Sequence, residues 1–402
     1  MGTKADLNGA DISLETEGTS LYRVWRSGGE VIRDEYLHTD VYETPKFFTE
    51  ATIMHYALRI KHCSSVAVAM SGGVDSSLTA ALLIERGFEV VGVTMLLDDA
   101  QNIDDARNVC EHLGIKHHVA DFRKIFRAKV EDYFVAEYLR GRTPNPCVRC
   151  NREIKFGTLF DFVTTELDAD FLATGHYARI VFDGGRFKLK RAADVRKDQS
   201  YVLYNLTADK LSKILLPMGD FTKAETRRLA DEMKLPVANK PDSQEICFVP
   251  NDDYKSFVAA RKPEAQALQA GDIVDGDGKI LGRHRGVANY TIGQRKGLGI
   301  AAEHPLYVTR LDVDNRKVFV DAGDKLFSDE LTAHDAHWIY KPTLPKNLHA
   351  KIRYGSRIAT CTVAEDENFL RVTFDEAQRA ITSGQSIVFY DGDEVLGGAI
   401  ID

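Results

Sequence analysis

The chain has 402 residues, of which 44% are hydrophobic and 28% are charged, and its formal net charge is −8. This length allows two or three domains with separate cores, and the ordinary composition excludes a low-complexity or disordered chain. No apolar run reaches the roughly 18 residues that span a bilayer, and residues 1–19 are polar and acidic, so we expect no membrane helix or signal peptide and a cytoplasmic location. Six cysteines are too few for a disulfide scaffold of this length.

Residues 1–60 contain ten acidic and six basic residues and precede the first predicted strand. We predict an N-terminal extension here, and its sequence assigns it no role. The apolar run Val66–Met70 then predicts a buried strand, the segment Ser71-Gly-Gly-Val-Asp-Ser-Ser77 a glycine-rich turn, and Leu78–Arg86 a helix. Backbone N–H groups and the helix dipole favour a phosphate at such a turn.

This turn is neither a GxxxxGK[ST] loop nor a GxGxxG loop, because no lysine follows its glycines and their spacing differs. The alternative is a tight strand-to-helix turn with Ser and Asp caps. Strands are predicted at Glu89–Met95, Lys116–Ala120 and Phe171–Thr174, and helices at Asp104–His112 and Arg127–Leu139. This alternation predicts an α/β fold with a doubly wound parallel sheet.

Ligands bind such sheets beyond the carboxyl ends of the strands, where the glycine loop, Met95 and the turn that starts at Gly175 all fall. The residues predicted to line one nucleotide pocket are therefore Ala69, Met70, Ser71, Gly72, Gly73, Val74, Asp75, Ser76, Ser77, Met95 and Gly175.

After about Pro250 the sequence alternates in short segments separated by turn residues, which predicts β-strands at Leu306–Leu311, Lys317–Val320 and Leu370–Phe374. We expect a small β-rich central domain followed by a C-terminal β-barrel. The expected organisation is an extension at 1–60, a nucleotide-binding domain at 61–252, a central domain at 253–322 and a barrel domain at 323–402.

Three short runs are basic although the chain as a whole is acidic. Residues 140–155 hold five bases and one acid, residues 186–197 hold six bases and one acid, and residues 283–296 hold four bases and no acid. Basic runs of this kind favour a nucleic-acid partner, and solvated surface charge is the alternative.

The segment Arg142–Phe156 places Cys147 and Cys150 three apart, beside two prolines and several cations. Neighbouring cations favour the reactive thiolate, so we expect sulfur chemistry here, together with Cys247. Half of a zinc site is the alternative, but no second Cys/His pair has zinc-like spacing. We expect Cys63, Cys110 and Cys361 to be buried and to pack like small hydrophobic residues.

The Ser71–Ser77 loop resembles the SGGxDS loop of the ATP pyrophosphatases (PP-loop enzymes). From about residue 65 to 402 the chain resembles the tRNA-specific 2-thiouridylases, which place sulfur on the wobble uridine of certain tRNAs. The matching segments are Ser71–Ser77, Thr143–Phe156, Gly175–Arg179, Lys197–Tyr201, Asp242–Phe248, Tyr290–Ile300 and Ser383–Ser386.

The resemblance implies that Cys150 is the nucleophilic cysteine and Cys247 the persulfide cysteine. It also implies a set of tRNA contacts: Asn145, Pro146, Cys147, His176, Lys197, Asp198, Gln199, Arg353, Tyr354 and Gln385. ATP would transfer AMP to the uridine C2 oxygen, with Asp75 near Mg²⁺, and sulfur would then replace that oxygen.

Cys147 departs from the family pattern, in which many members have an aspartate with a proton-transfer role. With three cysteines, Cys147, Cys150 and Cys247, the chain could instead hold a four-iron four-sulfur cluster whose open iron binds hydrosulfide. Cys147 is therefore a third candidate catalytic residue. Both the persulfide and the cluster route are open, and we favour the persulfide.

The expected partners are tRNAs with Lys, Glu and Gln acceptor identity, and a cysteine desulfurase or sulfur-relay protein. One alternative is another PP-loop synthetase or amidotransferase that adenylates a carboxylate or amide. A second is a non-enzymatic ATP-binding sulfur carrier. The first leaves the two-cysteine segment unexplained, and the second requires neither the basic runs nor the β-rich C-terminal part.

Overall fold

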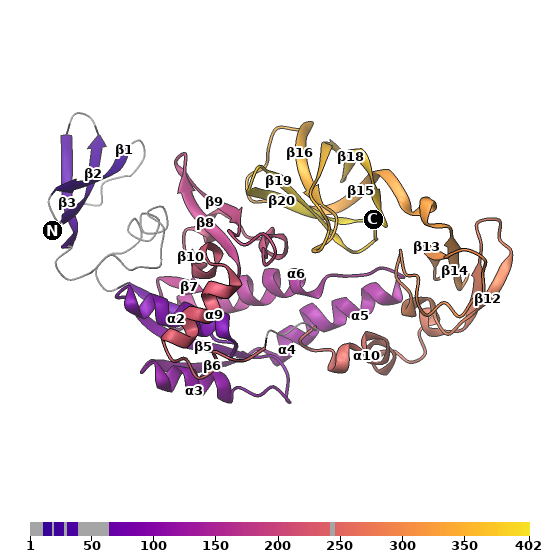
Figure 1. The fold of residues 1–402 in the computed structure, drawn as a ribbon, viewed down its shortest axis with the longest axis horizontal. Coiled ribbons are helices and arrows are strands. Elements are labelled where there is room, and N and C mark those ends of the chain that lie inside the picture. Colours follow the sequence, from indigo (N-terminus) through magenta and orange to yellow (C-terminus); the bar gives the residue numbers. More distant parts are fainter. Residues whose placement is uncertain (1–10, 18–19, 28–29, 39–63, 242–245) are drawn as a thin grey trace. The chain divides into compact units, whose positions relative to one another are not determined.

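The computed structural model describes residues 11–17, 20–27, 30–38, 64–241 and 246–402 (Figure 1). It divides into two compact units, Met1–Ser64 and Ser65–Asp402. The first contains an antiparallel sheet in the order β1-β2-β3, with strands β1 Asp11–Glu17, β2 Ser20–Ser27 and β3 Glu30–His38. The rest of the predicted extension, residues 61–63 with Cys63, and residues 242–245 of the Cys247 segment lie outside the described residues.

The second unit begins with a parallel sheet whose strand order is β10-β7-β4-β5-β6. Its strands are β4 Ser65–Ala69, β5 Glu89–Leu96, β6 Lys116–Asp121, β7 Phe171–Ala173 and β10 Ile214–Leu215. Val66, Ala67 and Val68 of β4 are fully buried, because helices cover the sheet. The predicted α/β fold with a parallel sheet is confirmed.

The helices of this unit are α2 Val74–Glu85, α3 Asp104–His112, α4 Arg123–Phe126, α5 Asp132–Leu139, α6 Pro146–Cys150, α7 Phe160–Thr165, α8 Ala208–Leu211, α9 Lys223–Glu232 and α10 Tyr254–Arg261. Two π-helices, η2 Arg127–Glu131 and η3 Asn151–Leu159, connect α4 to α5 and α6 to α7. The predicted helix at 127–139 therefore starts four residues earlier, at Arg123.

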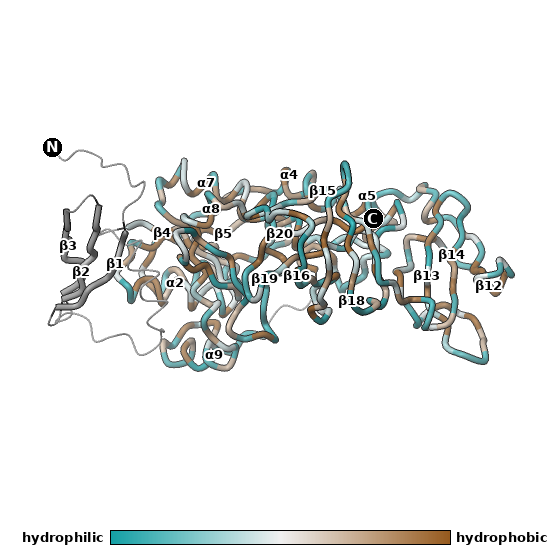
Figure 2. Tube along the Cα trace, turned by 90° about the horizontal axis from the view of Figure 1, so that it is seen from above, coloured by the Kyte–Doolittle hydropathy of each residue, from teal (hydrophilic) through white to brown (hydrophobic). Residues whose placement is uncertain are grey.

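A smaller β-rich region follows, with a sheet in the order β12-β11-β14-β13. Its strands are β11 Gly271–Val274, β12 Ile280–His284, β13 Tyr307–Asp312 and β14 Lys317–Asp321. Ile273, Val308, Val318 and Val320 are fully buried and form the centre of its core. The turns beside β14 are hydrophilic in Figure 2, as expected for a sheet with one buried face.

The C-terminal strands form a closed barrel, because its first strand pairs with both its fourth and its last. The strands are β15 Phe327–Trp338, β16 Lys346–Lys351, β17 Ala359–Asp366, β18 Phe369–Arg379, β19 Ser386–Asp391 and β20 Glu394–Ile401. The predicted barrel is confirmed.

One feature of the barrel sheet was not predicted. The hairpin β8 Ala178–Asp183 and β9 Arg186–Arg191 extends this sheet, with Lys190 opposite Glu394 of β20. The hairpin follows β7 directly in the chain, so it connects the nucleotide-binding region to the barrel.

Candidate active site

The glycine-rich loop lies between β4 and α2, as its sequence predicts. Gly72 has a φ of +71°, and a Cβ there would lie 2.9 Å from the Cβ of Asp105, so only glycine fits without movement. Ser77 Oγ donates to Gly73 O at 2.8 Å and thereby fixes the loop to the first turn of α2. The N-cap residue Gly73 offers no side-chain cap, so the first N–H groups of α2 are left to bind an anion.

Asp75, in the first turn of α2, receives two hydrogen bonds from distant segments. Tyr177 Oη donates to Asp75 Oδ1 at 2.8 Å, and Lys223 Nζ donates to the same oxygen at 2.7 Å. Lys240 Nζ donates to Gly72 O at 2.9 Å. The loop itself contains no lysine, but Lys223 and Lys240, from distant parts of the chain, contact it.

The sequence patterns did not predict Lys223 and Lys240 at this site. The signal for Lys223 is the capping box that starts α9, in which Thr222 Oγ1 accepts from the N–H of Glu225 and the Glu225 side chain accepts from the N–H of Thr222. That signal predicts where the helix begins, but not what it faces.

The turn at Gly175 lies against the glycine-rich loop Ser71–Ser77 (the phosphate loop). A Cβ at Gly175 would lie 2.8 Å from the backbone carbon of Asp75 and 2.8 Å from the nitrogen of Ser76. Met95 lies near the end of β5, half-buried, and its carbonyl accepts a hydrogen bond from Gln101 at 2.9 Å. The predicted grouping of loop, strand end and turn is therefore present in the geometry, while ATP contacts of single residues stay predictions.

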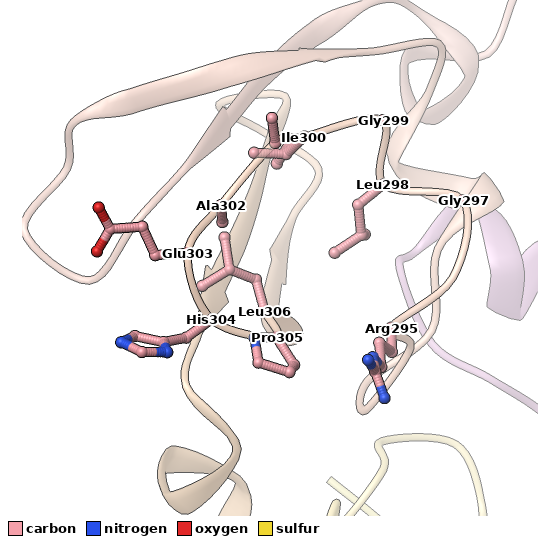
Figure 3. A pocket seen from close by; sticks show the side chains of 11 residues that line it. Arg295, Gly297, Leu298, Gly299, Ile300, Ala302, Glu303, His304, Pro305 and Leu306 are labelled. Atoms are coloured by element: carbon pink, nitrogen blue, oxygen red, sulfur yellow. The ribbon is translucent and has the colours of Figure 1, made fainter.

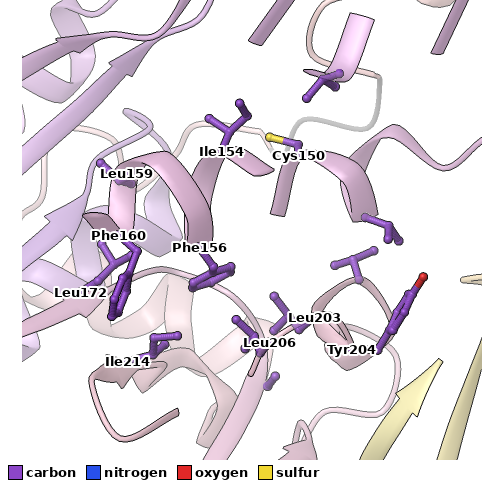
Figure 4. Close-up of a cluster of buried hydrophobic side chains, with 14 of the residues drawn as sticks. Cys150, Ile154, Phe156, Leu159, Phe160, Leu172, Leu203, Tyr204, Leu206 and Ile214 are labelled. Carbon is purple, nitrogen blue, oxygen red and sulfur yellow. The ribbon is translucent and has the colours of Figure 1, made fainter. Parts of the chain in front are cut away.

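The cysteines lie in different environments. Cys147 and Cys247 are exposed, and Cys150 is buried, with its sulfur beside Ile154 (Figure 4). Burial raises the pKa of Cys150 to about 12, and the positive charge of Lys155 opposes this rise. Desolvation also raises the pKa of Cys247. For Cys150 and Cys247, desolvation outweighs the positive charge of Lys155, contrary to the expectation that neighbouring cations favour the thiolate.

The three thiols lie near one another, because Cys147 and Cys247 both raise the pKa of Cys150 and Cys147 raises that of Cys247. Within the described ranges, no group of three or more His, Cys, Asp or Glu side chains is placed to hold a metal ion. None of the cysteines in these ranges forms a disulfide, and Cys110 and Cys361 are buried as predicted. The persulfide and cluster routes of sulfur transfer therefore both stay predictions.

The loop before Cys147 is attached to the barrel. Thr143 N donates to Ser383 O at 2.8 Å, and Gln385 Nε2 donates to Thr143 O at 2.8 Å. Asn145 caps α6, accepting from the N–H of Cys147 at 3.1 Å, and Pro146 occupies the first helical position, where its missing N–H is tolerated. Gln385 thus holds the cysteine loop in place with the side chain that was predicted to contact tRNA.

Asp198 is buried, and its carboxylate accepts from the N–H groups of Ala192 and Ser200, each at 3.1 Å. Its carboxylate orders the 192–200 segment and does not face solvent. Gln199 Oε1 accepts from Tyr177 N at 2.8 Å. The carboxylate of Asp198 is therefore not exposed, whereas Gln199 is half-buried, and the tRNA contacts of both residues stay predictions.

The remaining predicted tRNA residues differ in exposure. His176 is buried; its Nδ1 pairs with Thr174 Oγ1 at 2.7 Å, its Nε2 lies 3.4 Å from Lys155 Nζ, and burial lowers its pKa well below the usual value. Tyr354 is 43% exposed, with its ring edge-on to Tyr201, and Arg353 is half-buried beside it. The backbone N–H of Lys197 donates to Asp194 O at 3.0 Å.

Two of the three basic runs are largely neutralised by acids. In residues 186–197, Arg186 pairs with Glu394, Lys190 with Asp393 and Arg191 with Asp198. In residues 140–155, every arginine has a carboxylate partner.

The third run differs. Only Arg283 pairs with an acid, Asp272, within the part of the chain that the structure describes. The side chains of Arg285, Arg295 and Lys296 are exposed. The central region therefore keeps most of its local positive charge.

Two cavities lie away from the phosphate loop. One, of about 690 Å³, is open to solvent and is lined by residues of the loop from Arg295 to Leu306 in the central region (Figure 3). The other, of about 220 Å³, lies between α5, α6 and the barrel and is lined by four arginines, Arg140, Arg142, Arg149 and Arg152, among other residues.

Of the helices that the structure describes, none combines the length and the apolar character that crossing a membrane requires.

Comparison with known proteins identifies the family. The tRNA methyl transferase HUP domain model matches residues 64–251, the tRNA methyl transferase PRC-barrel domain model matches 255–322, and the aminomethyltransferase β-barrel domain model matches 328–401. A tRNA-specific 2-thiouridylase MnmA of Carboxydothermus hydrogenoformans is 47% identical over 357 residues, which cover 84% of this chain and 97% of that protein. The protein of the same name from Pelotomaculum thermopropionicum is 44% identical, with 84% and 97% covered.

A solved structure of a 4-thiouridine synthetase–RNA complex with bound ATP aligns with 50% of this chain and 51% of that chain, at 15% identity and a TM-score of 0.33, which is too low to carry an argument. The chain belongs to the tRNA-specific 2-thiouridylases, enzymes of ATP-dependent 2-thiouridine synthesis in tRNA.

Proposed function

We propose that this enzyme adenylates the C2 oxygen of the wobble uridine, position 34, and replaces that oxygen with sulfur delivered through Cys247 and Cys150. The proposal rests on the contacts of two adjacent residues, His176 and Tyr177. Tyr177 donates to Asp75 in the phosphate loop, and His176 lies against Lys155, one helical turn from Cys150. The dipeptide His176–Tyr177 therefore contacts both the phosphate loop and the segment that carries Cys150.

The first step requires ATP at the loop, with its phosphates on the N-terminus of α2. Tyr177 and Lys223 both bind Oδ1 of Asp75, which leaves Oδ2 for Mg²⁺, a cation that prefers carboxylate oxygen. When bound, Mg²⁺ neutralises phosphate charge. Transfer of AMP to the C2 oxygen releases pyrophosphate and turns that oxygen into a good leaving group.

In the second step the terminal sulfur of a Cys247 persulfide attacks C2, and AMP departs with the electron pair of the C2–O bond. The Cys150 thiolate then attacks Sγ of Cys247. The new bond is the Cys150–Cys247 disulfide, and the bond that breaks joins Sγ to the transferred sulfur, which keeps the electron pair as the 2-thio group. A dithiol reductant must return two electrons to the disulfide before the next turnover.

The upstream sulfur donor in this proposal is a cysteine desulfurase or sulfur-relay protein, and the substrates are tRNAs of Lys, Glu and Gln identity in the cytoplasm. The exposed cations of the central region, Arg285, Arg295 and Lys296, support a phosphate-binding role there. Residues Asn145–Cys147 and Arg353–Tyr354 would face the wobble base, which must leave its stack to reach the pocket. The domain boundaries at 60, 252 and 322 remain part of this proposal.

Nucleoside mass spectrometry of tRNA from cells that lack the protein tests the function directly: 2-thiouridine should disappear. In vitro, purified enzyme with tRNA, Mg-ATP and a persulfide donor should release pyrophosphate only when tRNA is present. Cys150→Ser should release pyrophosphate without forming 2-thiouridine. Pyrophosphate release that needs a carboxylate or amide substrate in place of tRNA would favour a synthetase, and the absence of turnover would favour a carrier.

A further inference from the structure

The helical stretch that carries the cysteines is widened where it passes them. Its middle, η3, is a π-helix, which hydrogen-bonds residues five apart and often marks a functional site. Two observations show the wide turn directly. Thr158 Oγ1 donates to Glu153 O, five residues earlier, at 3.1 Å, and a Cβ at Gly157 would lie 2.9 Å from Arg152 O, also five residues earlier.

This widening brings a second residue, besides Ile154, to the turn above Cys150. In an α-helix the neighbours one turn later are the third and fourth residues on, and the fourth is the apolar Ile154. In a π-helix the residue five later, Lys155, lies one turn above Cys150. The π-helix thus brings an ammonium group toward the thiol.

Lys155 also differs from the other bases of its run. Each arginine from 140 to 152 has a carboxylate partner, whereas Lys155 has none among the residues that the structure describes. Its side chain is half-buried, and its ammonium lies 3.4 Å from Nε2 of His176. Because burial keeps His176 neutral, the histidine does not offset the charge. A half-buried cation without a counter-ion is costly, and an anion would relieve that cost.

The position of Lys155 indicates which anion this is. Its charge favours the thiolate forms of both Cys150 and Cys247, so Lys155 lies near the two sulfurs that the proposed reaction uses. An ammonium has three donors, and the contact with His176 leaves two for another ligand. In the proposed reaction sulfur is anionic twice: as the persulfide before it attacks C2, and as the transferred sulfur when its bond to Cys247 breaks.

We propose that Lys155 is the cation that stabilises the anionic sulfur during its transfer from Cys247 to the uridine. The inference deepens the proposed function and depends on it. Lys155 forms no covalent bond and keeps its protons throughout, so the atoms and electrons balance as in the two steps above. Its role is to lower the energy of a charged intermediate after AMP has been attached.

The test is a single-turnover experiment on full-length enzyme preloaded with persulfide, which measures pyrophosphate and 2-thiouridine separately. Lys155→Met should release pyrophosphate at the wild-type rate and form 2-thiouridine about 10²–10³-fold more slowly, the usual effect of removing one electrostatic stabiliser. Adenylated tRNA should accumulate. Lys155→Arg should recover most of the rate, and Lys124→Met, which removes an exposed lysine of α4, is the matched control.

Chemical rescue separates a charge effect from a packing effect. Ethylammonium should restore 2-thiouridine formation by Lys155→Ala in a concentration-dependent way, while an isosteric neutral alcohol should not. If Lys155→Met slowed pyrophosphate release and 2-thiouridine formation equally, Lys155 would act in adenylation or in folding, and the inference would be overturned. A wild-type rate of 2-thiouridine formation by Lys155→Met would overturn it as well. If wild type released pyrophosphate but formed no 2-thiouridine, the proposed function would fail and the inference with it.

Discussion

Lys223 Nζ lies 2.7 Å from Asp75 Oδ1, although the two residues are 148 positions apart in the chain. The contact joins the first residue of α9 to the first turn of α2. The side chain of Lys223 is 13% exposed and that of Asp75 33%, so the ion pair is partly shielded from solvent. It supplies the phosphate loop with a positive charge that the loop's own sequence lacks.

Asp75→Asn should reduce tRNA-stimulated pyrophosphate release by at least about 10²-fold, because it removes the negative charge at the predicted Mg²⁺ position. The change also weakens the acceptor of Lys223 and Tyr177, which should lower the free energy of unfolding by about 1–3 kcal/mol. Asp104→Asn, at an exposed ion pair on α3, should alter neither quantity noticeably. Normal pyrophosphate release by Asp75→Asn would show that the loop is not the ATP site.

Gly175→Ala should destabilise the protein by about 1–3 kcal/mol and weaken ATP binding, because the new methyl group would overlap the backbone of Asp75 and Ser76. Gly355→Ala is the matched control, since nothing lies within 4 Å of a Cβ at that position. Urea unfolding and calorimetric titration with a non-hydrolysable ATP analogue measure the two effects. Equal ATP affinity in wild type and Gly175→Ala would separate the turn from the nucleotide site.

Cys147→Asp restores the commoner residue of the family and should keep substantial activity, because only Cys150 and Cys247 change covalent partners in the persulfide route. Iron, acid-labile sulfide and 2-thiouridine should be measured after anaerobic reconstitution of both proteins. An active, iron-free wild type supports the persulfide route. A cluster-loaded, active wild type beside an inactive Cys147→Asp would refute it.

Replacing Arg295 and Lys296 together with Ala should weaken tRNA binding and make the slope of log affinity against log salt shallower, by about 0.7–0.9 for each phosphate that the variant no longer binds. Arg283→Ala should have a smaller effect, because Asp272 already neutralises Arg283 at 2.9 Å. Binding curves at several salt concentrations test this. Unchanged slopes in the double variant would mean that these cations are ordinary surface charge.

His176 predicts a pH dependence of stability. Its pKa in the folded state is well below 6.5, so above about pH 6.5 neither state holds the extra proton and the histidine contributes nothing. As the pH falls below 6.5 the unfolded state binds that proton and the folded state does not, so the free energy of unfolding should fall by up to about 1.4 kcal/mol per pH unit. His176→Gln should remove part of this slope between pH 6.5 and 5.5, and His349→Gln, at an exposed position of β16, should not.

Helices and strands that depend on the local pattern of apolar residues were predicted correctly from the sequence. The strand β4, the helix α3 and the strand β14 follow from apolar runs and helical spacing, and all three were placed within a residue. The hairpin β8–β9 was missed, because its alternation is obscured by charged residues and its partner β20 is formed by the last residues of the chain.

The same limit applies to the site. Asp198 belongs to a polar segment that is typical of an exposed loop, yet its carboxylate is enclosed by backbone N–H groups. The pKa of Cys150 depends on how deeply the thiol is buried, which its cationic neighbours in sequence do not reveal. Lys223 could not be assigned to Asp75, because no local pattern encodes a contact across 148 residues.

The shared sheet sets an order of events during protein synthesis. Strand β9 ends at residue 191 and its barrel partner β20 begins at residue 394, so a ribosome must add about 200 residues before the pair can form. At about 5–20 residues per second this takes roughly 10–40 s, during which the outer edge of the hairpin has no strand beside it. An unpaired edge can recruit other chains, and the many charges of β9, including Arg186, Lys188 and Lys190, protect a nascent chain against such association.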